Sequence, residues 1–366
     1  NTADQINATW GSSGALPVVS LNGNYSNGKH IVDDGGIARG SIDLDWTVFD
    51  GMRMFATHSK NQSLDEINSI YFRAMVENTI RQVINQYYLI VSTQQQMVSI
   101  QQTLAVSQTR YEHVLARHEI GSASKLDALN AKVDFNTDSS SYLRAEEQIL
   151  SAKASLNQLL ARPINTEFEV VEDIPFTPYM DFANLHAKAL EQNTDLNIAR
   201  LETMMGEATL KETDALLMPT VSLNAGYDFM RLNQNSMGFY YGAGFRMNLF
   251  NGLETARKRK NARLELESIK LAEEASILDL ETRLRLNFIN YQTNRDLVIL
   301  ESENIDVAKQ NMDISLERYK LGNLSALELR ESQRNYLNAI DRYTNSLYLT
   351  KLAETILKQL AGELGK

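Results

Sequence analysis

Two glutamates, Glu328 and Glu331, lie three positions apart and are the clearest candidates for a functional site in the sequence. Side chains three positions apart share one side of a helix, and clustered carboxylates repel one another and attract cations. Asp127 is a third candidate, because it occupies the place of Glu328 in an earlier, similar stretch. The alternative is that Asp127 and Glu328 cap helices and that Glu331 favours a helix N-terminus. For Glu328 the two roles are compatible.

The other candidates for chemistry are weak. His113 and His118 are five positions apart, a spacing that does not place both on one helical face for a metal ion. The glycine-rich run 35–40 is expected in a turn between strands and lacks the helix that a phosphate-binding loop needs. The sequence therefore predicts no metal site and no cofactor, and an enzyme is the least expected class.

The stretches that carry the acidic residues have the pattern of tight turns between long helices. Gly322 can take the left-handed conformation that ends a helix, and Ser325 with Glu328 has the pattern of a capping box that begins the next one. The same pattern occurs 201 positions earlier, at residues 121–127. A repeat at this distance indicates a duplicated helical hairpin.

Composition limits the class of protein. The chain has 366 residues with 5 Pro and 18 Gly, so few residues interrupt its elements. A net charge of −10 argues against a nucleic-acid partner, and 0 Cys leaves no disulfide framework or thiol metal site. Residues 1–17 show no secretory signal. The longest uncharged run, 82–109, contains too many Gln and Asn to be a transmembrane helix.

Long helices are predicted in both halves. Residues 60–117 and 253–318 contain no Pro or Gly, and helices over them would be roughly 87 Å and 99 Å long. Such helices do not fit inside a globular domain. Returning helices are expected over 126–161 and from the second turn to about residue 360. A proline-containing linker and helical periodicity from about 182 to 217, broken near 193–195, lie between the halves.

Two segments, 17–50 and 219–250, alternate apolar and polar residues and are predicted to be β-hairpins with one apolar face. Four strands are too few to close a barrel and would leave exposed edges, whereas only a closed barrel satisfies every backbone group in lipid. Several copies of the chain are therefore predicted to share one membrane barrel. The alternative is that both hairpins pack their apolar faces together in a soluble sandwich.

The order and spacing of several short motifs resemble the TolC family of outer-membrane efflux and secretion channels over almost the entire chain. These motifs are the tight turns of the two helical hairpins, here called tips (118–125 and 319–326), and Leu16-Pro17, Phe49-Asp50-Gly51, Met218-Pro219 and Phe250-Asn251-Gly252. The resemblance implies an α+β membrane protein in the cell outer membrane of a Gram-negative bacterium. It would be a homotrimer, with four β-strands per chain in a shared twelve-stranded transmembrane β-barrel in lipid and long α-helices in a periplasmic α-barrel. The helix expected before the first strand is reduced to residues 1–16, so we expect the start of the first repeat, with any signal peptide or lipidated cysteine, to be absent.

The resemblance also implies roles for tip residues. Glu328 and Glu331 match acidic rings that narrow the periplasmic aperture, and Asp127 and Tyr319 match a pair that helps hold it shut. Leu324 departs from the family, because the best-known member has a linking arginine there. The small, polar tips are expected to dock a periplasmic adaptor (membrane fusion) protein and, through it, an inner-membrane transporter. The expected docking residues are Gly121, Ser122, Ser124, Gly322, Asn323 and Ser325.

The function implied by the resemblance is that of an exit duct. It would serve a tripartite efflux pump or a type I secretion system and pass drugs, small molecules or proteins. The alternative is a soluble periplasmic coiled-coil scaffold without channel activity. The predicted organisation is a first repeat, a linker with equatorial helices, and a second repeat. Their bounds are 1–162 (β-hairpin about 17–50, helical hairpin about 60–161, tip 118–125), 163–218, and 219–366 (β-hairpin 219–250, helical hairpin 253–361, tip 319–326).

Overall fold

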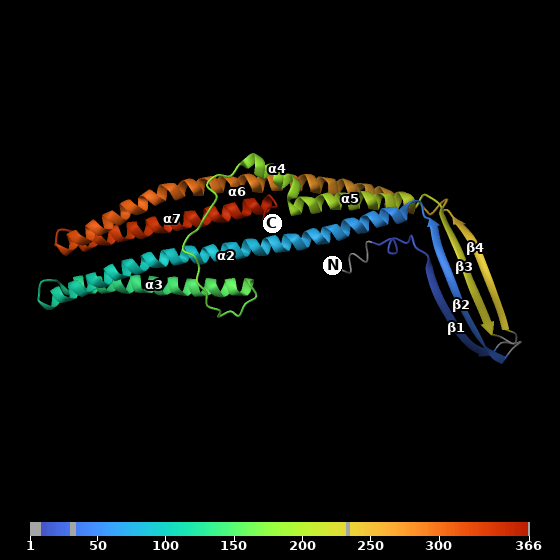
Figure 1. The fold of residues 1–366 in the computed structure, drawn as a ribbon, viewed down its shortest axis with the longest axis horizontal. Coiled ribbons are helices and arrows are strands. Elements are labelled where there is room, and N and C mark those ends of the chain that lie inside the picture. The colour runs from blue at the N-terminus through green and yellow to red at the C-terminus, as the bar shows by residue number, and fades with distance from the viewer. Residues whose placement is uncertain (1–8, 30–33, 232–234, 365–366) are drawn as a thin grey trace. The chain divides into compact units, whose positions relative to one another are not determined.

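Long helices and one antiparallel sheet make up most of the fold (Figure 1). The computed structural model describes residues 9–29, 34–231 and 235–364. Helices α2 and α6 have 67 residues each, about 100 Å at the usual helical rise. The elements in chain order are β1 (Val18–Lys29), β2 (Asp34–Phe49), α2 (Arg53–Glu119), α3 (Lys125–Leu159), α4 (Phe182–Gln192), α5 (Thr194–Ala215), β3 (Thr220–Arg231), β4 (Asn235–Arg246), α6 (Glu254–Lys320) and α7 (Ala326–Leu360).

The chain forms two compact units, and each draws on both halves of the sequence. The sheet unit comprises Asn1–Ala74 and Thr194–Leu278, and the hairpin unit comprises Met75–Asn193 and Asp279–Lys366. Helices α2 and α6 contribute residues to both units. The division into repeats rests on internal sequence similarity and stays a proposal.

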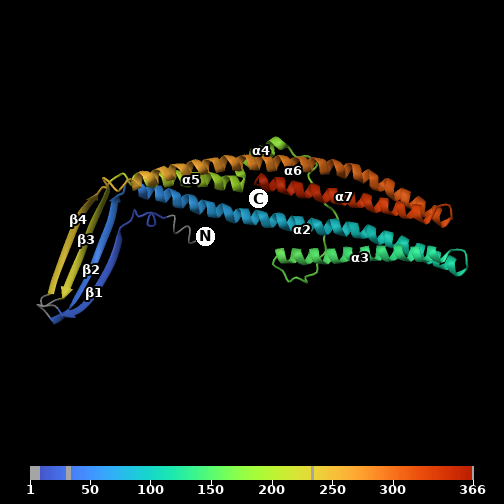
Figure 2. The ribbon, with the colours of Figure 1, turned by 180° about the vertical axis from the view of Figure 1, so that it is seen from behind.

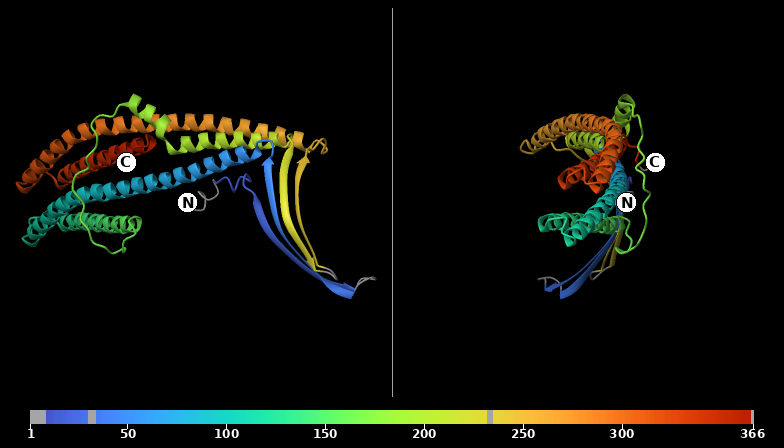
Figure 3. Two further views of the ribbon diagram at one scale, coloured as in Figure 1. Left: turned by 45° about the vertical axis from the view of Figure 1, so that its right-hand side comes forward. Right: turned by 90° about the vertical axis from the view of Figure 1, so that its left-hand side faces the viewer.

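The sheet has the order β1-β2-β3-β4, with every neighbouring pair antiparallel (Figure 3). Its register keeps apolar residues opposite one another across all four strands. Leu21 pairs with Ile42, Ile42 with Tyr227, and Tyr227 with Phe239. Cross-strand pairs of this kind stabilise a sheet. One face of the sheet is therefore continuously apolar, as the alternation predicts.

This apolar face is exposed in the single chain. Leu21 is 77% exposed, Phe239 69% and Tyr241 82%. The described strands form one sheet, and no second sheet packs on it. The sandwich that the soluble alternative requires is therefore not formed by the described residues of one chain. The opposite face is polar, with Asn22 donating to the carboxylate of Asp43 at 2.7 Å and Ser41 donating to it at 2.6 Å.

The strand bounds correct two sequence-based expectations. The run 35–40 lies in β2 and not in a turn, because β1 extends to Lys29 and β2 begins at Asp34. Residues 30–33 of the expected loop, and residues 1–8 of the expected N-terminal tail, lie outside the described residues. Strand β4 ends at Arg246, opposite Thr220 at the start of β3. Pro219 directly precedes Thr220 and has no N–H to continue the hydrogen-bond ladder between β3 and β4. Met247 and Leu249 therefore lie beyond the end of β4.

Helix α2 begins earlier than its predicted start at Lys60. Asp50 follows β2 and accepts a hydrogen bond from the backbone N–H of Met54 at 3.2 Å, and Gly51 has a φ of 73°. A side-chain acceptor at a helix start satisfies an otherwise unpaired N–H. The break predicted near 193–195 is confirmed, because α4 ends at Gln192 and α5 begins at Thr194. None of the helices in the described residues is both long enough and apolar enough to cross a bilayer.

The hairpin unit contains two helical hairpins and the linker between α3 and α4. Residues of α2 and α3 form one hairpin, residues of α6 and α7 form the other, and both turns lie at the same end of this unit (Figure 2). The linker crosses between them: Ile174 is 2% exposed and packs in one cluster with Val91, Val298 and Leu347. The linker therefore joins the two hairpins through an apolar core.

Candidate functional site

The turn between α2 and α3, here called tip 1 (residues 118–125), has the predicted conformation. Gly121 has a φ of 75°, and its N–H donates to the carbonyl of His118 at 2.9 Å. Ser124 forms a capping box with Asp127: the N–H of Asp127 donates to Ser124 Oγ at 3.1 Å, and the N–H of Ser124 donates to the Asp127 carboxylate at 3.2 Å. The hydrogen bonds from Ser124 lower the pKa of Asp127.

The turn between α6 and α7, tip 2 (residues 319–326), repeats this arrangement. Gly322 also has a φ of 75° and donates to the carbonyl of Tyr319 at 2.9 Å. Ser325 and Glu328 form the second capping box, with N–H to oxygen distances of 3.3 Å and 2.9 Å. The hydrogen bonds from Ser325 lower the pKa of Glu328. Both predicted capping boxes are therefore confirmed, and Asp127 and Glu328 serve as helix caps.

The predicted aperture residues lie on or beside the tips. Glu331 is exposed and forms an ion pair with Arg334 at 3.8 Å. Tyr319 is half-buried, and burial raises its pKa. The charges of Arg110, Arg117 and Asp127 have smaller effects on this pKa. That these side chains line an aperture stays a prediction.

The tips also carry apolar side chains that the expectation of small, polar tips did not include. Ile120 and Leu126 are 79% and 65% exposed on tip 1, and Leu321 and Leu327 are 74% and 79% exposed on tip 2. They occupy equivalent positions in the two halves, 201 residues apart. This spacing was readable from the sequence. The six expected docking residues, Gly121, Ser122, Ser124, Gly322, Asn323 and Ser325, are all exposed beside them.

A charge network joins the two hairpins next to the tips. The guanidinium of Arg330 on α7 donates to both oxygens of Asp138 on α3, at 2.6 Å and 2.8 Å. Ser107 also donates to Asp138, and Arg110 forms an ion pair with Asp134. The Asp138 side chain is only 8% exposed. Bidentate pairing of Arg with a carboxylate is geometrically specific, so this network fixes one arrangement of the two hairpins.

Removing Asp138 should destabilise the hairpin unit, because Arg330 would lose its partner in a mostly buried site. We expect Asp138→Ala to lower the free energy of unfolding by about 3 kcal/mol. Denaturant unfolding of the purified protein measures this change. Asp306→Ala on exposed α6 surface is the control and should change stability by less than about 0.5 kcal/mol. Equal, small effects of both variants would contradict the structural role of the network.

The two histidines considered in the sequence lie in different surroundings. His113 is exposed, whereas a ring nitrogen of His118 lies 3.0 Å from the carbonyl oxygen of Ala123 within tip 1. In the part of the chain that the structure describes, no group of three or more His, Cys, Asp or Glu could hold a metal ion.

Solved structures with the same fold include outer membrane channels. The CmeC outer membrane channel of Campylobacter jejuni has a TM-score of 0.86 at 15% identity, and the match covers 99% of this chain and 81% of the CmeC chain. The outer membrane protein VceC of Vibrio cholerae has a TM-score of 0.83 at 15% identity, and the match covers 99% of this chain and 90% of the VceC chain. The open-state MtrE outer membrane channel of Neisseria gonorrhoeae has a TM-score of 0.82 at 15% identity, and the match covers 99% of this chain and 84% of the MtrE chain. No curated protein matches the sequence.

The family follows from the sequence as well as from the fold. The model of the outer membrane efflux protein family matches residues 3–162 and 185–363, so the chain belongs to this family. The resemblance inferred from the motifs is therefore confirmed. Members are outer membrane transport proteins and not enzymes, and the chain is an efflux exit duct. Nothing supports the soluble scaffold.

Proposed function

We propose that three copies of this chain assemble one exit duct whose twelve-stranded β-barrel crosses the outer membrane. The observation that carries the proposal is the sheet of β1 to β4, which has a continuous, exposed apolar face. Among the described residues β1 pairs only with β2 and β4 only with β3, so both edges are open. Lipid tolerates no open edge. Closure with β1 of one copy beside β4 of the next satisfies both edges.

The helical hairpins of the three copies would form the periplasmic tunnel of this duct. Its repeats would be residues 1–162 and 219–366, joined by 163–218. The exposed apolar pairs on the tips, together with the small residues around Gly121 and Gly322, suit docking of helical hairpins from a periplasmic adaptor protein. Through that adaptor an inner-membrane transporter of an efflux pump or type I secretion system would deliver drugs, small molecules or proteins.

Cross-linking tests the shared barrel. The chain has 0 Cys, so cysteines introduced at Val19 in β1 and Phe245 in β4 are the only thiols. Both residues lie on the exposed apolar face near the same end of the sheet. A short bis-maleimide should link the double variant in outer membranes into covalent trimers, while either single variant stays monomeric in SDS. A double variant that gives no species above the monomer would contradict the proposal.

We further propose that Glu328 and Glu331 form two acidic rings in the closed aperture. Replacing both by Gln keeps the capping box at Ser325, because Gln can fill the same position. The loss of six carboxylates should raise the concentration of a trivalent cation that half-blocks the single-channel current by at least about tenfold. Glu317→Gln, on α6 before tip 2, is the control. Unchanged block in the double variant would remove both residues from the aperture.

A further inference from the structure

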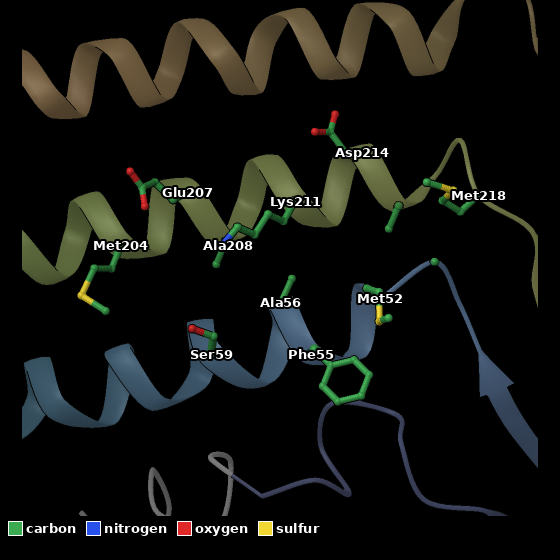
Figure 4. Close-up of a pocket in the computed structure, with 12 residues that line it drawn as sticks. Met52, Phe55, Ala56, Ser59, Met204, Glu207, Ala208, Lys211, Asp214 and Met218 are labelled. Carbon is green, nitrogen blue, oxygen red and sulfur yellow. The ribbon is translucent and has the colours of Figure 1, made fainter.

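A cavity of about 420 Å³ lies in the sheet unit, between the beginning of α2 and the end of α5 (Figure 4). Its size is within the range of small-molecule sites. Four large apolar side chains line it, and all four are more than half exposed. These are Met52, Phe55, Met204 and Met218. Methionine side chains adapt to irregular apolar ligands.

The cavity has a lysine whose charge is not matched. Figure 4 shows Lys211 on the side of α5 that faces α2, whereas Glu207 and Asp214 project from the other side. Glu207 is paired with Lys270 of α6 at 3.2 Å, and Asp214 with Arg259 of α6 at 2.6 Å. Within the described residues Lys211 has no ion-pair partner. The lining therefore presents one free positive charge next to an apolar surface.

The neighbouring acid on α5 does not neutralise this lysine either. Glu212 accepts a hydrogen bond from Thr57 Oγ1 at 2.6 Å and pairs with Lys60 at 3.2 Å. The three carboxylates nearest Lys211 in the sequence of α5 are thus each held by a partner on α2 or α6. An anionic group is the ligand that this arrangement leaves room for.

The cavity lies where the sheet meets the helices. Gly51 follows the end of β2 by two residues, and Met218 precedes the start of β3 by two. Trp10 packs against Phe55 with ring centroids 5.5 Å apart and stacks on His58. Aromatic and basic side chains are enriched at membrane interfaces. If the sheet spans the membrane as proposed, the cavity opens at the membrane surface.

We propose that this cavity binds an anionic glycerophospholipid, with its phosphate on Lys211 and its chains along Phe55 and the three methionines. A lysine near a membrane surface attracts anionic lipid, and its stem can lie along apolar groups while its ammonium meets the phosphate. The location at the membrane surface rests on the proposed function, whereas the cavity and its charge do not.

Fluorescence quenching of Trp10 tests the site. Trp46 is the second of 2 tryptophans in the chain, so Trp46→Phe leaves Trp10 as the single reporter. The full chain, purified in dodecyl maltoside, is titrated with phosphatidylglycerol brominated in its acyl chains. Saturable quenching is expected, and Lys211→Gln should weaken the apparent affinity about tenfold, the equivalent of one charge-assisted contact. Lys211→Arg should retain it, and Lys258→Gln, which removes a lysine paired with Glu254 at 2.7 Å, should have no effect.

Titrations with different ligands distinguish the possible occupants of the cavity. Brominated phosphatidylcholine should bind more weakly than phosphatidylglycerol, and inorganic phosphate should not compete, because it lacks the chains. Equal affinities of the two lipids would overturn the inference, and so would equal affinities of the Lys211→Gln and unchanged proteins for phosphatidylglycerol. Absence of quenching, the result expected if a neighbouring copy covers the cavity, would overturn it too. Trimer formation is measured on the same samples. An intact trimer without lipid discrimination refutes the lipid site alone, whereas absence of a trimer refutes the proposed function.

Discussion

Glu354→Ala is expected to lower the free energy of unfolding by about 3–5 kcal/mol, the cost of leaving buried charges without their partner. The Glu354 side chain on α7 is only 2% exposed. It accepts hydrogen bonds from the backbone N–H and the hydroxyl of Thr177 in the linker, at 3.2 Å and 2.8 Å, and pairs with Lys351 at 3.4 Å and with Lys358. One carboxylate thus ties the linker to the second hairpin.

Denaturant unfolding and limited proteolysis of the linker measure this effect together. The variant should be cleaved within residues 160–181 faster than the unchanged protein, because Thr177 loses its anchor. Glu303→Ala replaces an exposed glutamate on α6 and serves as the matched control, with an expected change below about 0.5 kcal/mol. A Glu354→Ala protein as stable and as protease-resistant as the control would show that the linker is held by its apolar contacts alone.

The same glutamate should make stability depend on pH in the acid range. Burial alone would raise the pKa of Glu354, but hydrogen bonds from Lys358 and Thr177 together with the charges of Lys351 and Lys358 outweigh it, and the pKa lies below the ordinary value of 4.5. A carboxyl whose pKa is lower in the folded state contributes stability above its unfolded pKa and loses it as the pH falls through the folded pKa. The stability difference between the unchanged protein and Glu354→Gln should therefore shrink below pH 4.5. A difference that is constant through this range would contradict the assignment.

Gly322→Trp is expected to abolish export while the proposed trimer remains in the outer membrane. Apart from the glycine itself and its two chain neighbours, no atom lies within 4 Å of the position where a Cβ would be at Gly322, so an indole would project from tip 2 into the proposed docking surface. The φ of 75° also makes any side chain there strained, at a cost of about 1–2 kcal/mol. The measurement is export of a fluorescent pump substrate, with trimer levels assessed in isolated outer membranes.

A second glycine separates strain from docking. Gly252, which precedes α6, has a φ of 65° and equally open surroundings, and Gly322 follows the same helix. Gly252→Trp therefore carries similar backbone strain away from the tips and should leave export close to normal. Gly322→Asn should be intermediate, because Asn tolerates the left-handed conformation and has a smaller side chain. Normal export by Gly322→Trp would count against docking at the tips.

Features that depend on neighbouring residues were predictable from the sequence. The left-handed glycines and capping boxes of the tips are set by Gly121, Gly322 and the Ser–acid pairs that follow them. The apolar face of the sheet follows from alternation, because side chains in a strand point to opposite sides in turn. These local rules also gave the family, since its motifs are the turns and strand starts themselves.

Features that depend on distant residues were not predictable in this way. Asp138 and Arg330 are 192 positions apart and meet only because the two hairpins pack side by side. The linker prolines mark irregular chain, but nothing in their spacing shows that Thr177 meets Glu354. The 201-residue spacing of the apolar tip residues Ile120 and Leu321 is visible in the sequence, but only the fold shows that both are exposed.

Conductance of the purified protein in a planar lipid bilayer tests the central claim most directly. If three chains seal one barrel through lipid, the detergent-purified trimer should insert and give discrete, uniform current steps, and the Val19 and Phe245 cysteine variant should keep these steps after cross-linking to the covalent trimer. A preparation that fractionates as a monomer and leaves the bilayer without discrete current steps would contradict the account.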